Sequence, residues 1–270
     1  MIDPSEVEDR WIEVPDRCVF RLSGPDRVRY LNGQVSNNVA GPLHEKAVPA
    51  CLCSLKGKVE ALVWISAVGE DLILDGELQQ REFLAERLDR YLIADDCELF
   101  DETGDWTLIH HLRSNGDGVE SRRLSEPGRD LWIRGEDPGL PGSTRISQEE
   151  WGILLIRSGV PESGLEITGD EFPAELGLDQ WAVDFHKGCY LGQEIVSRIE
   201  SVGRVKRALR ITVAEASRER GTLLRNAYAE SGKATRDFLP LIEKKFIGFG
   251  LFKKAKNSQQ VIDLEEVAEI

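Results

Sequence analysis

The pattern of apolar and polar positions predicts a chain of short strands interrupted by a few helices. Up to residue 134, strand-like apolar runs are bounded by turn residues. These runs cover residues 18–22, 48–55, 59–68, 72–74, 97–100, 106–111 and 131–134. Lys56-Gly57-Lys58 lies between two of these runs and predicts a hairpin. The strands do not alternate regularly with helices, so we expect an α+β protein and no parallel doubly wound sheet.

Three segments have helical spacing instead. The first opens at Gly24-Pro25-Asp26, with Pro25 at the first helical position, and stops near Gly33. The second covers residues 78–93, with Leu84 and Leu88 on one face. The third begins with a capping box at residues 147–150, covers residues 151–158 and ends before Gly159 and Pro161.

The chain after Gly203 returns to strand-like pieces. They cover residues 205–213, 221–224, 232–236, 246–252 and 261–267. Short strands in sequence, separated by turn signals, are typical of small barrels. We therefore expect a C-terminal β-barrel or barrel-like module.

Composition and charge restrict the class of protein. The 270 residues are 41% hydrophobic and 30% charged, which is typical of a packed globular chain, and the net charge is −14. Such an acidic chain argues against general nucleic-acid binding. The N-terminus lacks the pattern of a signal or transit peptide, and the apolar runs are far shorter than a membrane span. We expect a soluble protein without membrane association, cytoplasmic if bacterial.

The cysteines and histidines give weak evidence for a metal site. The five cysteines are odd in number and include no Cys-x-x-Cys pair, which argues against a disulfide scaffold and a zinc ribbon. Cys51 and Cys53 share one face of a predicted strand, and an iron–sulfur cluster held together with Cys189 is an alternative to a core role. His110 and His111 point to opposite faces of a strand and make a poor metal pair. We predict no metal site.

One segment, residues 185–198, concentrates reactive chemistry. Gly188 and Gly192 bracket Cys189, so the backbone there can turn tightly. Lys187 and a helix beginning just after Cys189 would both favour a thiolate, which predicts an accessible thiol with a lowered pKa. Glu194 and Arg198 have the spacing of a helical ion pair. The structural alternative is that Cys189 is a small buried apolar residue.

The stretch from Lys187 to Glu194 resembles the Lys-Gly-Cys-Tyr-x-Gly-Gln-Glu signature of the YgfZ family, the folate-binding branch of the aminomethyltransferase-like proteins. Weaker similarities lie at residues 22–26, 30–39, 56–59, 159–161, 173–176 and 198–207. The resemblance covers most of the chain up to about Arg207.

This resemblance implies a fold and a function. The fold is a three-lobed α+β structure around a central channel that binds tetrahydrofolate or a derivative. Residues 1–203 would form the folate-binding region, as two intertwined α+β lobes, and residues 204–270 the C-terminal module. The function is support of the assembly or repair of iron–sulfur clusters, so the expected partners are a reduced folate and iron–sulfur client or assembly proteins.

The resemblance also assigns roles to individual residues. Cys189 and Lys187 would act in the chemistry, while Gly188 and Gly192 shape the backbone. The residues expected to bind the cofactor are Asn32, Gln34, Asn37, Tyr190, Gln193, Glu194, Arg198 and Arg204. From charge and position, Arg204, Lys206 or Arg207 could hold the carboxylates of the folate tail, and Trp181 could border the channel.

Three positions depart from the related proteins. Asn38 stands where the YgfZ pattern has Asp, and Arg157 stands where the aminomethyltransferases have a Glu that contacts the folate ring. Glu60-Ala61 occupies the place of an Asp-Asp pair in the transferases, which argues against their chemistry. Two alternatives nevertheless stay open: a folate-dependent one-carbon transferase, and a non-catalytic scaffold on the same fold. Whether the protein is an enzyme is open at this point.

Overall fold

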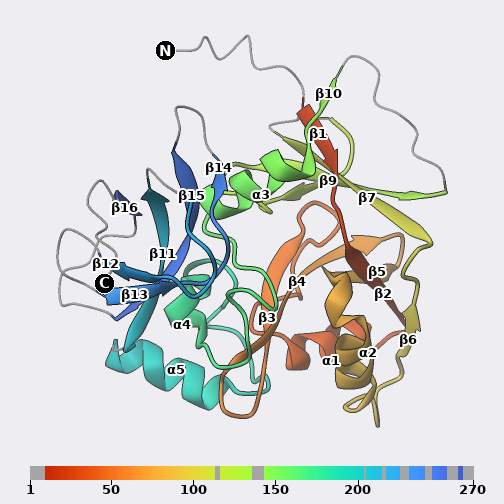
Figure 1. Ribbon diagram of the computed structural model, residues 1–270. Helices are drawn as coiled ribbons and strands as arrows, with labels where there is room; N and C mark the ends of the chain where they lie inside the picture. The colour runs from red at the N-terminus through yellow and green to blue at the C-terminus, as the bar shows by residue number, and fades with distance from the viewer. Residues whose placement is uncertain are drawn as a thin grey trace.

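The computed structural model describes residues 10–112, 116–135, 143–203, 205–214, 217–225, 231–240, 245–253 and 261–263. Three separate β-sheets, each accompanied by short helices, make up this part of the chain (Figure 1). Nearly all neighbouring strands are antiparallel; the parallel pairs are β1 with β10 and β11 with β16. The α+β class predicted from the sequence is confirmed.

The first sheet is five-stranded and antiparallel, in the order β3-β4-β5-β2-β6. Its strands are β2 (Arg17–Ser23), β3 (Val48–Cys53), β4 (Val59–Val68), β5 (Asp71–Glu77) and β6 (Glu98–Asp101). Helices α1 (Arg27–Gln34) and α2 (Arg81–Asp89), the latter preceded by the short helix η2 (Leu78–Gln80), accompany the sheet at the lower right of Figure 1. Tyr30, Leu31, Leu84 and Leu88 anchor them in the same core as the sheet.

The second sheet has the order β10-β1-β7-β9-β8. Its strands are β1 (Arg10–Glu13), β7 (Trp106–Leu112), β8 (Val119–Ser121), β9 (Gly128–Arg134) and β10 (Thr144–Arg145). Ile12 and Leu108 of this sheet share a core with Leu62 and Trp64 of β4. The central core therefore lies where the first two sheets meet.

Helix α3 (Gln148–Arg157) connects this central core to the third sheet. Its N-cap is confirmed, because Ser147 Oγ accepts a hydrogen bond of 3.1 Å from the Glu150 amide. Trp151 belongs to the central core, whereas Ile156 packs with Phe249 of the third sheet. Three short helices follow: α4 (Pro173–Leu176), η3 (Leu178–Gln180) and α5 (Gln193–Val202).

The third sheet contains strands that all follow Gly203, in the order β12-β13-β15-β11-β16, with β14 paired to β15. They are β11 (Arg207–Ala214), β12 (Leu223–Arg225), β13 (Ser231–Ala234), β14 (Leu239–Pro240), β15 (Phe246–Lys253) and β16 (Val261–Asp263). The barrel-like closure that we expected is not found: among the described residues no pairing joins β12 to β16. Instead β12 pairs with β13 and β16 pairs with β11, whereas a barrel closes through pairing of its end strands.

Most predicted strands are present within a few residues, and the hairpin at Lys56-Gly57-Lys58 is confirmed. The helix predicted over residues 78–93 was too long, since α2 ends at Asp89 and Ile93 is 85% exposed. Strands β1, β8, β10 and β14 were not predicted, because two to four residues carry too little alternation. Among the described helices, none has the length and apolar character required to cross a bilayer.

Candidate functional site

The signature loop, residues 185–192, lies between η3 and α5 and presents Cys189 to solvent. Gly188 beside it is also exposed, and a Cβ added there would meet no atom within 4 Å. The other four cysteines, Cys18, Cys51, Cys53 and Cys97, are buried. The predicted accessibility of Cys189 is confirmed, while its lowered pKa stays a prediction.

Lys187 points into the protein, away from solvent. Its ammonium group donates hydrogen bonds of 2.7 Å to the backbone carbonyls of Asn32, Val35 and Asn37. Three acceptors match the three donors of a lysine, and they lie at and just beyond the C-terminus of α1, where the helix dipole favours a cation. Burial lowers the pKa of Lys187 to about 8, an effect that the Asp184 carboxylate opposes. Lys187 thus acts as a clamp: its three hydrogen bonds attach the signature loop to the backbone at the C-terminal end of α1, called the α1 corner below.

Two further residues, Tyr190 and Gly192, hold the signature loop against the protein interior. The aromatic ring of Tyr190 is buried, with the Lys187 ammonium 5.4 Å from its centroid, and its hydroxyl has no hydrogen-bond partner. Burial raises the pKa of Tyr190. Gly192 has a φ of +85°, and a Cβ at this position would sit 2.3 Å from the Ser54 carbonyl oxygen of the β3–β4 hairpin. Only glycine fits this approach.

Helix α5 begins at Gln193, directly after Gly192, and not just after Cys189 as we expected. The turn that buries Tyr190 separates the thiol from the helix N-terminus, so the helix dipole is further from Cys189 than predicted. The ion pair between Glu194 and Arg198 is confirmed at 2.8 Å, on a solvent-facing side with the two side chains 83% and 63% exposed.

The three predicted folate ligands near α1 are held by the protein itself. Asn32 Oδ1 accepts from the Val39 amide at 3.1 Å, and Gln34 Oε1 accepts from Arg87 at 2.9 Å. Asn37 Nδ2 donates to the carbonyls of Pro49 (2.8 Å) and Trp181 (3.3 Å).

A cavity of about 540 Å³, called the main cavity below, is in the size range of ligand pockets; its connection to the signature loop is Asn37, which lines it and whose carbonyl accepts from Lys187. Of the predicted site residues, Asn37 lines it; Trp181 and Asn38 line it as well. Lys46 and Arg122 supply positive charge, and none of the described residues that line it is Asp or Glu.

The other predicted site residues do not line this cavity in the part of the chain that the structure describes. This holds for Asn32, Gln34, Lys187, Cys189, Tyr190, Gln193, Glu194 and Arg198. Their contacts with a folate stay predictions. Arg204 lies outside the described residues. Lys206 is exposed, and Arg207 is engaged, because both its Nε and Nη2 donate to the Glu175 carboxylate at 3.1 Å.

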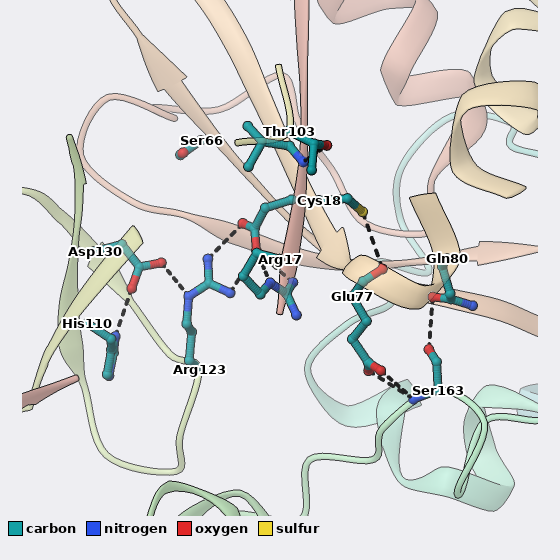
Figure 2. A network of polar contacts seen from close by, with 12 residues as sticks. Arg17, Cys18, Ser66, Glu77, Gln80, Thr103, His110, Arg123, Asp130 and Ser163 are labelled. Atoms are coloured by element: carbon teal, nitrogen blue, oxygen red, sulfur yellow. Dashed lines mark hydrogen bonds and ion pairs between the residues drawn. The ribbon is translucent and has the colours of Figure 1, made fainter. Parts of the chain in front are cut away.

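A buried network of charges joins the first two sheets beside a second cavity of about 470 Å³ (Figure 2). Arg123, only 2% exposed, donates to both oxygens of Asp75 on β5 and to Asp130 on β9. Arg17 also donates to Asp75, and His110 Nδ1 lies 2.7 Å from Asp130. Burial alone would raise the pKa of Asp130, but Arg123 and His110 hold it below its usual value.

This network includes one member of the adjacent pair His110 and His111. His110 is buried, and its Nδ1 pairs with the Asp130 carboxylate. The partners are 7 to 58 residues apart in the chain and follow no regular spacing, so the sequence gives no signal for them.

The structure does not bring the cysteines together as a cluster site. Cys51 and Cys53 do share one face, in the central core, and burial raises the pKa of Cys51 to about 12. Cys189 is exposed by contrast. No group of three or more His, Cys, Asp or Glu side chains with metal-binding geometry occurs among the described residues.

Glu60, at the position of the transferase carboxylates, is held away from the main cavity. Its carboxylate lies 3.8 Å from the guanidinium of Arg87, and burial raises its pKa. Ala61 beside it is fully buried. The side chains that sequence reasoning missed are Lys46 and Arg122, two cations far apart in the sequence that line the same cavity once the sheets are assembled.

Comparison with known proteins places these features in context. No family model matches the sequence. The chain is 22% identical over 227 residues to "Iron-sulfur cluster assembly factor IBA57 homolog, mitochondrial" of Neurospora crassa, covering 73% of this chain and 52% of that protein. It is 26% identical over 228 residues to "tRNA-modifying protein YgfZ" of Colwellia psychrerythraea, covering 73% of this chain and 69% of that protein. The aligned region thus spans about half the length of the IBA57-named relative.

A solved structure shows the same fold. The crystal structure of glycine cleavage system aminomethyltransferase T from Bartonella henselae superposes with a TM-score of 0.73 at 13% identity, covering 91% of this chain and 78% of that one. The chain is therefore a distant homologue of the YgfZ and IBA57 proteins and has the fold of the aminomethyltransferase T protein. The resemblance inferred from the signature is confirmed at this level.

Proposed function

We propose that this protein supports the assembly or repair of iron–sulfur clusters in client enzymes, with Cys189 as the working thiol and a reduced folate bound in the main cavity. In this proposal residues 1–203 carry the folate site and the signature loop, and residues 204–270 form an accessory β-module. Cytoplasmic location stays a prediction; one of the relatives is named as mitochondrial.

The observation that carries the proposal is the contrast between Cys189 and its surroundings. Four of the five thiols are buried, whereas Cys189 is exposed on a loop that Lys187 and Gly192 hold in place. A loop anchored this firmly around an exposed thiol presents the sulfur to a partner in a fixed geometry. A permanent cluster needs about four thiolates, so a single exposed thiol favours a transient ligand or nucleophile.

The lining of the main cavity supports the proposed binding of a reduced folate. A flat heterocycle can stack on Trp181 at the cavity wall, and amide groups of Asn37 and Asn38 lie close by. The carboxylates of a folate tail need cations, which Lys46 and Arg122 would provide; Arg122 also lies 4.0 Å from the Glu120 carboxylate, which does not line the cavity. Bound there, the folate would supply one-carbon or redox chemistry.

The alternative of a one-carbon transferase has less support. Its carboxylate pair is replaced by Glu60 and the buried Ala61, and Glu60 is directed to Arg87. A scaffold role on the same fold would need no exposed thiol. The relative named as tRNA-modifying suggests a link to tRNA, but a net charge of −14 favours an effect through a protein client over direct tRNA binding.

The test of the role is a strain that lacks this protein. Under oxidative stress we expect the activity of iron–sulfur dehydratases to fall in that strain and to return when the wild-type chain is supplied. Unchanged dehydratase activity in the deletion strain would contradict the proposal. Calorimetric titration with tetrahydrofolate and a methylene-transfer assay on the purified protein separate the accessory role from the transferase: we expect binding without transfer.

A further inference from the structure

The second cavity, of about 470 Å³, is large enough to hold a small organic ligand. Much of its wall is apolar and includes Leu78, Trp151 and Leu155. Val160 lines both this cavity and the main cavity. The Trp64 ring of the second cavity lies 6.4 Å from the Trp181 ring of the main cavity, measured between centroids. The protein thus has two neighbouring cavities of ligand size.

The charged side chains at the second cavity leave it with an excess of negative charge. Its acidic lining residues are Asp16, Glu77 and Glu162. Arg17 and Arg123 line it as well, but the buried carboxylates of Asp75 and Asp130 balance their charges (Figure 2). The main cavity has the opposite character, since its charged lining residues, among those described, are cations. The second cavity therefore disfavours an anionic folate and favours a cation.

Asp16 is the acidic side chain that remains available to a ligand. The Glu77 carboxylate accepts from the Ser163 amide at 2.8 and 3.1 Å, and burial raises its pKa, so it offers less negative charge. Glu162 pairs with Arg236 at 2.6 Å. Asp16 is exposed, and in the part of the chain that the structure describes its carboxylate has no hydrogen bond or ion pair. It can therefore pair with a cation at the mouth of the cavity.

The backbone holds Asp16 in place between β1 and β2. Its carbonyl accepts a hydrogen bond of 2.7 Å from the Leu78 amide, at the start of η2. Its φ is +51°, and it is the one residue other than glycine with a positive φ among those described. Asp and Asn tolerate this conformation better than most residues. Asparagine can therefore replace Asp16 and remove its charge without a change of backbone.

We propose that the second cavity binds an organic amine, with its ammonium group on Asp16 and its apolar body against Trp151 and Leu155. The apolar wall explains why the cation is organic: it supplies no set of oxygen ligands for a metal ion, and no metal-binding group of His, Cys, Asp or Glu occurs among the described residues. The amine site is independent of the proposed folate function, because its ligand has the opposite charge and occupies the other cavity.

The experiment is an NMR titration of the full chain with ¹⁵N-labelled tryptophan. The probes are tryptamine and tryptophol, which differ in an ammonium group against a hydroxyl. The chain has six tryptophans, and Trp64→Phe and Trp151→Phe assign the two indole signals of the cavity. We expect tryptamine to shift both signals and to bind about 2- to 5-fold more tightly than tryptophol, the range for an exposed ion pair.

Asp16→Asn should lower the tryptamine affinity to that of tryptophol and leave the tryptophol affinity unchanged. Glu70→Gln is the matched control, because it removes the charge of an exposed carboxylate that lines none of the described cavities, and it should preserve both affinities. The remaining indole signals verify that each variant is folded.

Four results would overturn the proposal. These are equal binding of the two probes by the wild-type protein, a tryptamine preference that survives Asp16→Asn, shifts confined to tryptophans outside the second cavity, and no saturable shift at millimolar tryptamine. None of them bears on folate binding, which is measured separately.

Discussion

Replacing Lys187 with methionine tests whether this residue is a structural clamp. Methionine keeps an unbranched side chain of similar length and removes the ammonium group, so the carbonyls of Asn32, Val35 and Asn37 lose their common donor. We expect the variant to fold, to be less stable than the wild-type protein, and to hold the signature loop less firmly.

The expected loss follows from two opposing effects. Hydrogen bonds to a charged group contribute about 1.5–3 kcal/mol each. Burial of the ammonium opposes them, and a pKa lowered from 10.5 to about 8 corresponds to about 3 kcal/mol. The three bonds together exceed this opposition, so Lys187→Met should lower the free energy of unfolding by about 1–5 kcal/mol. For a chain of this size that is a fall in Tm of roughly 3–15 °C.

The assay is thermal and urea unfolding followed by circular dichroism, with Lys206→Met as the matched control at an exposed lysine. The control should unfold like the wild-type protein. If Lys187→Met has the wild-type Tm and urea midpoint, the clamp is not a stabilising element. A loss of cellular function without loss of stability would then assign Lys187 a chemical role.

Three other predictions concern the exposure of the thiols, the backbone at Gly192 and the titration of buried cysteines. Iodoacetamide should label one thiol per native chain, Cys189, and five after denaturation, because the other four are buried; mass spectrometry that finds two or more labelled sites in the native protein would contradict this. Gly192→Ala should lower the free energy of unfolding by about 2–4 kcal/mol, because φ is positive at this position and the added Cβ would meet the Ser54 carbonyl oxygen. Gly188→Ala, where a Cβ meets no atom, should change it by less than about 0.5 kcal/mol. Urea unfolding curves of the two variants measure both changes. Burial raises the pKa of Cys18 and Cys97 from 9.0 to about 11, so each thiol contributes stability that is complete below pH 9 and lost as the pH rises to 11. Between pH 9 and pH 11 the free energy of unfolding of Cys18→Ala should therefore fall by about 2–3 kcal/mol less than that of the wild-type protein. The same pH dependence in both proteins would refute the assignment.

The elements with long periodic patterns could be predicted from the sequence. The hairpin of β3 and β4 and the capped helix α3 follow from local signals, namely alternating apolar residues and Ser147 with Glu150. The β-barrel was wrongly expected, because short strands give the same pattern whether or not the sheet closes. Sheet closure depends on pairing between distant strands, which periodicity does not reveal.

The residues of the signature loop could be predicted from the sequence, but the directions of their side chains and their neighbours in the fold could not. The signature identified Lys187 and Cys189, but two residues that are close in the sequence point in opposite directions, one into the α1 corner and one to solvent. The cavity residues Lys46 and Arg122 come from connecting segments before β3 and after β8, far from the signature in the sequence. They come close together only when the first two sheets pack, and this packing cannot be inferred from the spacing of residues in the sequence.

The most direct test of the account is the cellular activity of Cys189→Ser. In the deletion strain under oxidative stress, dehydratase activity is measured with the wild-type chain, Cys189→Ser or Cys97→Ser supplied at equal levels of folded protein. Serine at the exposed position removes the thiol without disturbing any packed side chain, whereas Cys97 is a buried control. We expect Cys97→Ser to restore the dehydratase activity to the wild-type level and Cys189→Ser to fail to restore it. Full restoration by Cys189→Ser would contradict the assignment of Cys189 as the working thiol.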